Sequence, residues 1–222
     1  MKKLFLQAVG KFAAGLIIVA ALLFVPAGTL RYGNAWLLLA LLFIPMFAAG
    51  IVMMFRRPDL LRRRLNAKEE QNEQKTVVAL SAVMFIAAFS AAGLTVRFGW
   101  YMFPKWLIIA GSAVFLAAYL LYAEVLRENV YLSRTVEVRE GQKVIDSGLY
   151  RIVRHPMYAA TLFLFLSMGL ILGAPASLVI LVFYVPIIAM RMKNEEKVLE
   201  EGLPGYREYR TRVRYRVIPF LW

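Results

Sequence analysis

The sequence predicts an all-α integral membrane protein with about six membrane-spanning helices. Three observations carry this prediction. Hydrophobic residues make up 61% of the 222 positions. Charged residues make up only 18%, whereas a soluble domain carries about 25%. Several apolar runs also approach the roughly 20 residues that a helix needs to cross a bilayer.

The first four predicted spans are full-length apolar runs, which lie at residues 12–30, 34–55, 76–96 and 104–126. The chain up to residue 126 is therefore expected to form a four-helix transmembrane region with few chemically reactive side chains. The small residues of the third span suit close packing between helices in lipid; they are Ala87, Ala88, Ala91, Ala92 and Gly93.

The last two predicted spans are short, at residues 156–172 and 176–190, and Gly173-Ala174-Pro175 separates them. Pro156 and Pro175 each stand where a helix can begin, the position that proline tolerates best. We therefore expect a short helical hairpin, residues 156–190, inside a second region, residues 127–222, which holds most of the chemically able polar side chains and is the candidate for the catalytic region.

Two cytoplasmic segments complete this second region. Residues 136–148 combine a Val-Glu-Val alternation with turn residues, which indicates an irregular segment containing a short hairpin. After residue 190 a helical pattern continues to about Tyr209, with expected interruptions at Gly202 and at Pro204-Gly205. The apolar and aromatic tail, residues 217–222, is expected to lie at the membrane interface.

The placement of charge predicts the topology. Of the 27 lysines and arginines, 24 lie before the first span, in residues 56–75, in residues 127–154 or after residue 190. The other three, in the alternate loops, are Arg31, Arg97 and Lys105. The positive-inside rule therefore predicts that both termini are cytoplasmic. The short loops favour a prokaryotic cell membrane, and a eukaryotic chain of this kind would belong in the endoplasmic reticulum membrane.

The same pattern indicates the partners and excludes several functions. The net charge of +13 fits contact with anionic lipids and is too dispersed for a nucleic-acid footprint. With no cysteine and one histidine, we expect no disulfide and no metal site. No Gly-x-Gly sequence occurs, which excludes the dinucleotide fingerprint and the P-loop.

Polar groups bracket the predicted hairpin. Arg154-His155-Pro156-Met157-Tyr158 precedes it, and Arg191-Met192-Lys193-Asn194-Glu195-Glu196 follows it. Each group has an ordinary structural reading by itself: a helix cap, an interfacial tyrosine, a snorkelling arginine, or an Arg191–Glu195 pair at helical spacing. Because both ends of a hairpin lie on one side of the bilayer, we expect the two groups to form one pocket at the cytosol–lipid boundary.

Three motifs in this order resemble those of the isoprenylcysteine carboxyl methyltransferase family. The first runs from Gly148 to Tyr158, the second is Arg191-x-x-x-Glu195-Glu196-x-x-Leu199, and the third runs from Gly205 to Tyr209 with Arg212-Val213 and Ile218-Pro219. The resemblance covers roughly the last 90 residues. The wider superfamily also contains phospholipid N-methyltransferases.

The resemblance implies methyl transfer from S-adenosylmethionine to a lipophilic acceptor that enters from the bilayer. It assigns cofactor binding to one set of residues: Tyr150, Arg154, His155, Pro156, Tyr158, Glu195 and Glu196. Arg191 would orient an acceptor carboxylate, as in an isoprenylcysteine, and Arg191 and Glu196 form the expected catalytic pair. Two alternatives remain: phospholipid or amine N-methylation, in which a glutamate serves as base, and a membrane scaffold or partner-binding subunit without enzymatic activity.

Overall fold

The computed structural model describes residues 2–65, 72–132, 135, 136, 138 and 140–222. These residues form helices and connecting turns, without a strand. The elements are α1 (Lys2–Ala27), α2 (Gly33–Arg56), α3 (Pro58–Leu65), α4 (Asn72–Arg97), α5 (Lys105–Glu128), the 3₁₀ turn η1 (Gly148–Arg151), α6 (Pro156–Ile171), α7 (Pro175–Val182), α8 (Tyr184–Gly202) and α9 (Tyr206–Arg212). The predicted all-α fold is confirmed.

Five helical stretches of the described chain are long and apolar enough to cross a membrane: Lys3–Ala27, Gly33–Arg56, Glu73–Arg97, Lys105–Glu128 and Pro175–Gly202. The sixth predicted span is α6. Its 16 residues reach about 24 Å at 1.5 Å per residue, less than the roughly 30 Å of a bilayer core.

The two arms of the predicted hairpin differ in length. The sequence predicted two short spans, but only α6 is short. The second arm, Pro175–Gly202, is 28 residues long, and its helix is interrupted only at Phe183, between α7 and α8. The polar residues after position 190 therefore lie on the same helix as the apolar stretch, which fixes their direction relative to α6.

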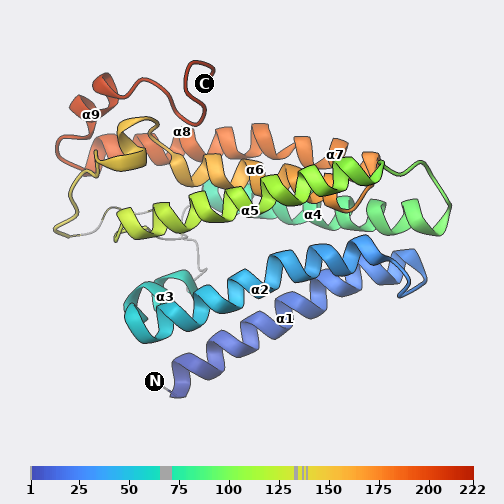
Figure 1. The fold of residues 1–222 in the computed structure, drawn as a ribbon. Helices are drawn as coiled ribbons and strands as arrows, with labels where there is room; N and C mark the ends of the chain where they lie inside the picture. Colours follow the sequence, from blue (N-terminus) through green and yellow to red (C-terminus); the bar gives the residue numbers. More distant parts are fainter. Residues whose placement is uncertain (1, 66–71, 133–134, 137, 139) are drawn as a thin grey trace.

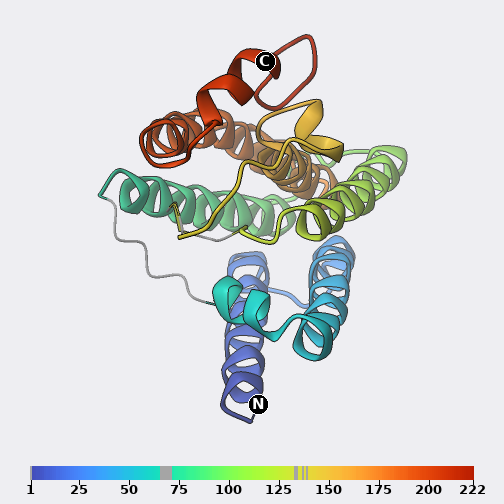
Figure 2. The same ribbon diagram turned by 90° about the vertical axis from the view of Figure 1, so that its left-hand side faces the viewer.

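Helix α6 lies at the centre of one layer of the molecule. Figures 1 and 2 show α4, α5, α6, α7 and α8 gathered together, with α1 and α2 along one side, where α1 packs against α4, and α2 against α5 and α6. Ten of the 16 residues of α6 are buried. A helix that is apolar around its whole circumference is typical of a protein core or of a membrane span, so α6 provides a packed base for the residues at its beginning.

The turn between α6 and α7 is held at the end of the molecule away from both termini (Figure 1). Gly173 adopts a positive φ of 70°, a conformation open to glycine. Its carbonyl accepts a 2.8 Å bond from the Phe103 N–H. The Tyr32 hydroxyl donates to the Leu172 carbonyl at 2.6 Å. These bonds join the connections α1–α2, α4–α5 and α6–α7.

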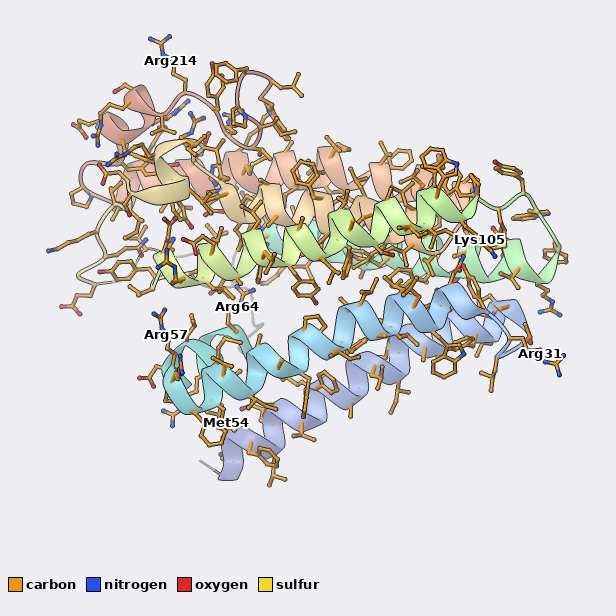
Figure 3. All side chains as sticks on the ribbon, in the orientation of Figure 1. Arg31, Met54, Arg57, Arg64, Lys105 and Arg214 are labelled. Atoms are coloured by element: carbon orange, nitrogen blue, oxygen red, sulfur yellow. The ribbon has the colours of Figure 1, made fainter. Side chains whose placement is uncertain are left out.

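The opposite end gathers the basic segments. Figure 3 shows Arg57, Arg64 and Arg214 at this end, whereas Arg31 and Lys105 lie toward the other. The structure thus groups the segments as the charge pattern predicted. The assignment of this end to the cytoplasm remains a prediction.

Two expectations about the connecting segments need correction. Residues 56–75 were expected to form a loop, but they contain α3, whose Leu60 and Leu61 are buried where α3 packs against α1 and α2. The short hairpin expected within residues 136–148 has no strand in its described residues. Two of its positions, 137 and 139, lie outside the described residues.

Candidate functional site

The segment before α6 is fixed by the C-terminal tail. His155 is the N-cap of α6, and Pro156 is its first residue. Proline disfavours a helical conformation in the residue before it, so His155 lies outside the helix. The backbone N–H groups of Arg154 and His155 instead donate to the carbonyls of Tyr215 and Arg216, at 2.9 and 2.8 Å. This pairing places the first predicted motif against the tail.

Glu196 is the centre of a buried ionic cluster. Its side chain accepts hydrogen bonds from Arg154 Nε at 2.8 Å, His155 Nε2 at 3.2 Å and Arg216 Nη2 at 2.8 Å. Only 3% of the residue is exposed. A buried carboxylate is tolerated when hydrogen bonds and opposite charges replace its water. Because an ionised carboxylate only accepts, the proton between the two side chains lies on His155 Nε2.

Arg154 extends this cluster to a third chain segment. Its Nη1 donates to the carbonyls of Val213 and Arg214, both at 2.8 Å. The guanidinium therefore joins the start of α6, the face of α8 that carries Glu196 and the segment after α9. Such a planar fork of donors suits several acceptors at once.

A second polar group lies one residue earlier on α8. The Tyr158 hydroxyl, on a buried side chain, donates to Glu195 Oε2. It also accepts a 3.0 Å hydrogen bond from Arg191 Nε. Arg191 and Glu195 stand at the i,i+4 spacing that suggested a simple pair, and Tyr158 of α6 bridges them. The predicted proximity of residues 154–158 to residues 191–196 is confirmed.

Tyr150 in η1 is held by hydrogen bonds to both its side chain and its backbone. Its hydroxyl accepts a 2.9 Å bond from Asn129 Nδ2, and its carbonyl accepts a 2.7 Å bond from the Tyr209 hydroxyl. Burial raises the pKa of both phenols, Tyr150 and Tyr209, above the usual range. Both therefore stay protonated, and Tyr209 remains a donor.

These elements surround a pocket at the polar end of the molecule. Its walls come from residues 129, 131, 132, 135, 136 and 142–145, from η1, from the beginning of α6, from the end of α8 and from α9. Six predicted site residues line it: Tyr150, Arg154, His155, Tyr158, Arg191 and Glu195. Two others do not line it: Pro156 begins the helix, and Glu196 lies behind the wall, where it binds the side chains of Arg154 and His155.

Three residues of the site were not foreseen as such from the sequence. Arg216 binds Glu196, Tyr209 binds the Tyr150 carbonyl, and Tyr206 lines the pocket. Tyr206 and Tyr209 belong to the third motif, Gly205 to Tyr209, so that motif was the available signal. Arg216 is one of four basic residues in alternation, at positions 210, 212, 214 and 216, and the alternation does not indicate which one points inward.

The chain segment that builds most of this pocket matches a known family. Residues 106–204 match the phospholipid methyltransferase family model. The matched range covers just under half of the chain and includes α6 and both motifs that bracket the hairpin. The expected resemblance to membrane methyltransferases is confirmed over this range, and the match indicates a membrane methyltransferase.

A curated relative resembles part of the chain. The Delta(14)-sterol reductase TM7SF2 of Mus musculus is 29% identical over 91 residues, which make up 40% of this chain and 22% of the reductase. The chain therefore spans about a fifth of the length of this relative. The two sequences share a segment, and that segment is a small part of the reductase.

Proposed function

We propose that this protein is a methyltransferase that transfers a methyl group from S-adenosylmethionine to a lipophilic acceptor entering from the bilayer. The observation that supports this most is the pocket itself. Both motifs that bracket the α6–α8 hairpin contribute to its wall, and the phospholipid methyltransferase match covers both. The pocket also lies where a polar end of the molecule meets apolar helices, which suits a polar cofactor and a greasy acceptor.

The residues present suit this cofactor. Glu195 offers a carboxylate to a cationic group of the ligand, and His155, Tyr158 and Tyr150 offer ring and hydroxyl contacts. Arg154 and Glu196 would act on the cofactor mainly through their neighbours, since each already binds protein groups. When bound, S-adenosylmethionine would supply a sulfonium methyl, and a carboxylate that accepts it gives a methyl ester and S-adenosylhomocysteine.

Carboxyl O-methylation is the reaction that we favour. A carboxylate acceptor is already ionised at neutral pH and needs no base. It does need a cation to orient it, and positioning is the main requirement of such a transfer. Arg191 lies on α8 between the apolar residues of the helix and Glu195, and it lines the pocket. This is the position from which a guanidinium can meet the head of a lipid-like acid such as an isoprenylcysteine.

N-methylation of a phospholipid or amine is the second candidate, and the match to the phospholipid methyltransferase family favours it. An amine acceptor must lose a proton, and Glu195 is the pocket carboxylate that could take it. A non-enzymatic scaffold is the third reading, and it requires no ligand in the pocket.

Binding of the cofactor is expected to move side chains. The cavity has a volume of about 100 Å³, smaller than the roughly 300–1,000 Å³ of typical small-molecule sites. A ligand of the size of S-adenosylhomocysteine must therefore widen it. We expect slower backbone hydrogen exchange around η1 and residues 140–147 when the ligand is added.

Calorimetry on the purified protein in detergent tests the proposal. S-adenosylmethionine or S-adenosylhomocysteine should bind the folded wild type. His155→Ala should weaken binding by about 10- to 100-fold, the loss expected for one charge-assisted hydrogen bond. Arg207→Ala, an exposed residue of α9, is the control and should bind normally. A folded wild type that binds neither ligand contradicts the proposal.

Arg191 separates cofactor binding from acceptor binding. Arg191→Ala should leave the affinity for S-adenosylhomocysteine within about threefold and should lower turnover strongly. Arg191→Lys should restore little, because an ammonium cannot reproduce the planar pair of donors. Arg191 and Glu195 both contact the Tyr158 hydroxyl. Glu195→Gln is therefore the control that measures how much a change in this shared contact weakens cofactor binding. If Arg191→Ala abolishes cofactor binding and Glu195→Gln does not, Arg191 belongs to the cofactor site.

A further inference from the structure

One face of α8 and of the residue that caps it lines the pocket along its length. The side chains on this face change from charged to aliphatic along the helix. Arg191, Glu195, Leu199 and Leu203 follow one another at intervals of four residues, and all four line the pocket. At 1.5 Å per residue they extend over about 18 Å. The wall is charged next to the apolar part of α8 and aliphatic at the end farther from it.

The aliphatic end is closed by residues of α9 and of the segment before η1. Leu203, Tyr206 and Tyr209 form a small buried cluster with Val213, and Val144 and Leu199 pack against it. Gly205 precedes α9 in a left-handed conformation with φ 84°. The chain thereby reverses after Leu203, and Tyr206 comes to line the same pocket as Leu199.

Tyr206 carries a polar atom that the protein leaves unused. The residue is only 4% exposed, and its hydroxyl has no hydrogen-bond partner among the residues that the structure describes. A buried hydroxyl without a partner costs about 1–3 kcal/mol. The hydroxyl of the neighbouring Tyr209, by contrast, is paired with the Tyr150 carbonyl. Both side chains line the pocket, so the Tyr206 hydroxyl is an unused polar group in its wall.

We propose that the Tyr206 hydroxyl hydrogen-bonds a ring nitrogen of the flat heteroaromatic base of a nucleoside ligand, which lies between Leu199, Leu203 and Val144. A planar base suits an aliphatic wall, and a single hydroxyl there gives it direction. The ligand is then oriented along α8, with its base at Leu203 and its charged end at Glu195, next to the acceptor that Arg191 would orient. This inference rests on the proposed cofactor and adds a residue and an orientation to it.

Burial keeps this phenol a donor. It raises the pKa of Tyr206 above its usual range, and the carboxylates of Glu196 and Glu195 raise it further. The hydroxyl is thus protonated throughout the physiological range, and a ring nitrogen with a lone pair is a suitable acceptor.

Two matched substitutions in the full-length protein test the role of this hydroxyl. Tyr206→Phe removes an unpaired group, so the melting temperature of the ligand-free protein should stay equal or rise. Its affinity for S-adenosylhomocysteine should fall by about 3- to 12-fold, as for one hydrogen bond. Tyr209→Phe removes a paired group, so its ligand-free melting temperature should fall.

A set of S-adenosylhomocysteine analogues, each with one ring nitrogen of the base replaced by carbon, tests the contact itself. One analogue should bind the wild type more weakly and should lose this penalty in Tyr206→Phe, because the two changes remove the same bond. Penalties that remain additive for every analogue overturn the assignment to the base.

The outcomes separate the two proposals. If the wild type binds S-adenosylhomocysteine and Tyr206→Phe binds it equally well, the inference is wrong and the proposed cofactor stands. If Tyr206→Phe melts as low as Tyr209→Phe, the hydroxyl is structural and the inference is also wrong. If the folded wild type does not bind S-adenosylhomocysteine, the proposed cofactor fails.

Discussion

Glu196 is the residue on which the site depends most. It binds groups from the segment before α6 and from the C-terminal tail, and it does so from α8, so one carboxylate fixes three parts of the chain. Without it, two guanidinium groups would lose their counter-charge. Arg154 would then remain buried with only the Val213 and Arg214 carbonyls as partners.

We therefore expect Glu196→Gln to lower the stability of the protein by roughly 3 kcal/mol, as for breaking a buried ion pair. The thermal unfolding of the purified protein in detergent measures this, and ligand binding should weaken as a consequence. Glu201→Gln, an exposed position on the same helix, is the matched control and should unfold as the wild type does. Equal unfolding of the two variants contradicts the role of Glu196.

Substitutions at Arg216 test whether the Glu196 cluster needs a guanidinium group or only a positive charge. Its Nε and Nη2 both reach Glu196, at 3.2 and 2.8 Å to Oε2, which is a paired-donor contact. Arg216→Lys should therefore restore only part of the stability that Arg216→Ala loses. Arg214→Ala, with an exposed side chain, should change the melting temperature little. Full recovery with lysine would show that charge alone matters at this position.

The sequence predicted one half of this cluster and missed the other. The turn Gly173-Ala174-Pro175 implied a hairpin, and a hairpin necessarily brings residues 154–158 to residues 191–196. Arg216 comes from a tail with no regular secondary structure. Its inward direction follows from two backbone hydrogen bonds to residues 154 and 155, and such long-range pairing leaves no periodic pattern.

At the scale of elements, the site depends on how closely α6 and α7 approach. A Cβ atom added at Gly169 would stand 2.6 Å from the Leu178 Cα and 2.9 Å from its Cβ. These distances are too short for carbon atoms, and backbone atoms of a packed helix cannot move aside cheaply. Small residues at such contacts let helices pack closely in membranes.

Gly169→Ala should accordingly lower stability by about 1–3 kcal/mol, the usual cost of overpacking. It should also weaken ligand binding, since α6 and α8 would shift relative to each other. Gly50→Ala is the matched control, because it is also a helical glycine and no atom lies within 4 Å of its added Cβ. Melting temperatures of both variants decide the matter: a Gly169→Ala protein as stable as Gly50→Ala contradicts this account of the hairpin.

The sequence predicted helices better than connections for a physical reason. Apolar runs and prolines at positions 156 and 175 mark where α6 and α7 begin, and the structure agrees. The predicted continuation of the second arm past residue 190, with an interruption at Gly202, is confirmed; only the span within it was taken as short, because hydropathy falls after residue 190. Helix α3 was missed because its eight residues contain only three leucines among charges, too few to show a clear period.

At the scale of the whole molecule, the segregation of charge predicts the orientation in the membrane. The chain contains no cysteine, so single cysteines can be introduced cleanly. Tyr101→Cys and Arg214→Cys replace exposed residues from opposite ends of the molecule. In intact cells, a membrane-impermeant maleimide should label position 101 and not position 214. Labelling of position 214 without permeabilisation contradicts a cytoplasmic pocket.

The most direct test of the account is methyl transfer by the purified protein. The protein is incubated with S-adenosylmethionine labelled in the methyl group and with either an isoprenylated cysteine acid or a phospholipid amine. Label that base releases as volatile methanol marks a methyl ester, and stable label marks an N-methyl group. We predict base-labile label on the isoprenylated acid, and strongly reduced label with Arg191→Ala. Stable label on the amine would replace the favoured reaction with N-methylation. A folded protein that transfers no methyl group to any lipophilic acceptor, including a membrane lipid extract, would contradict the central claim.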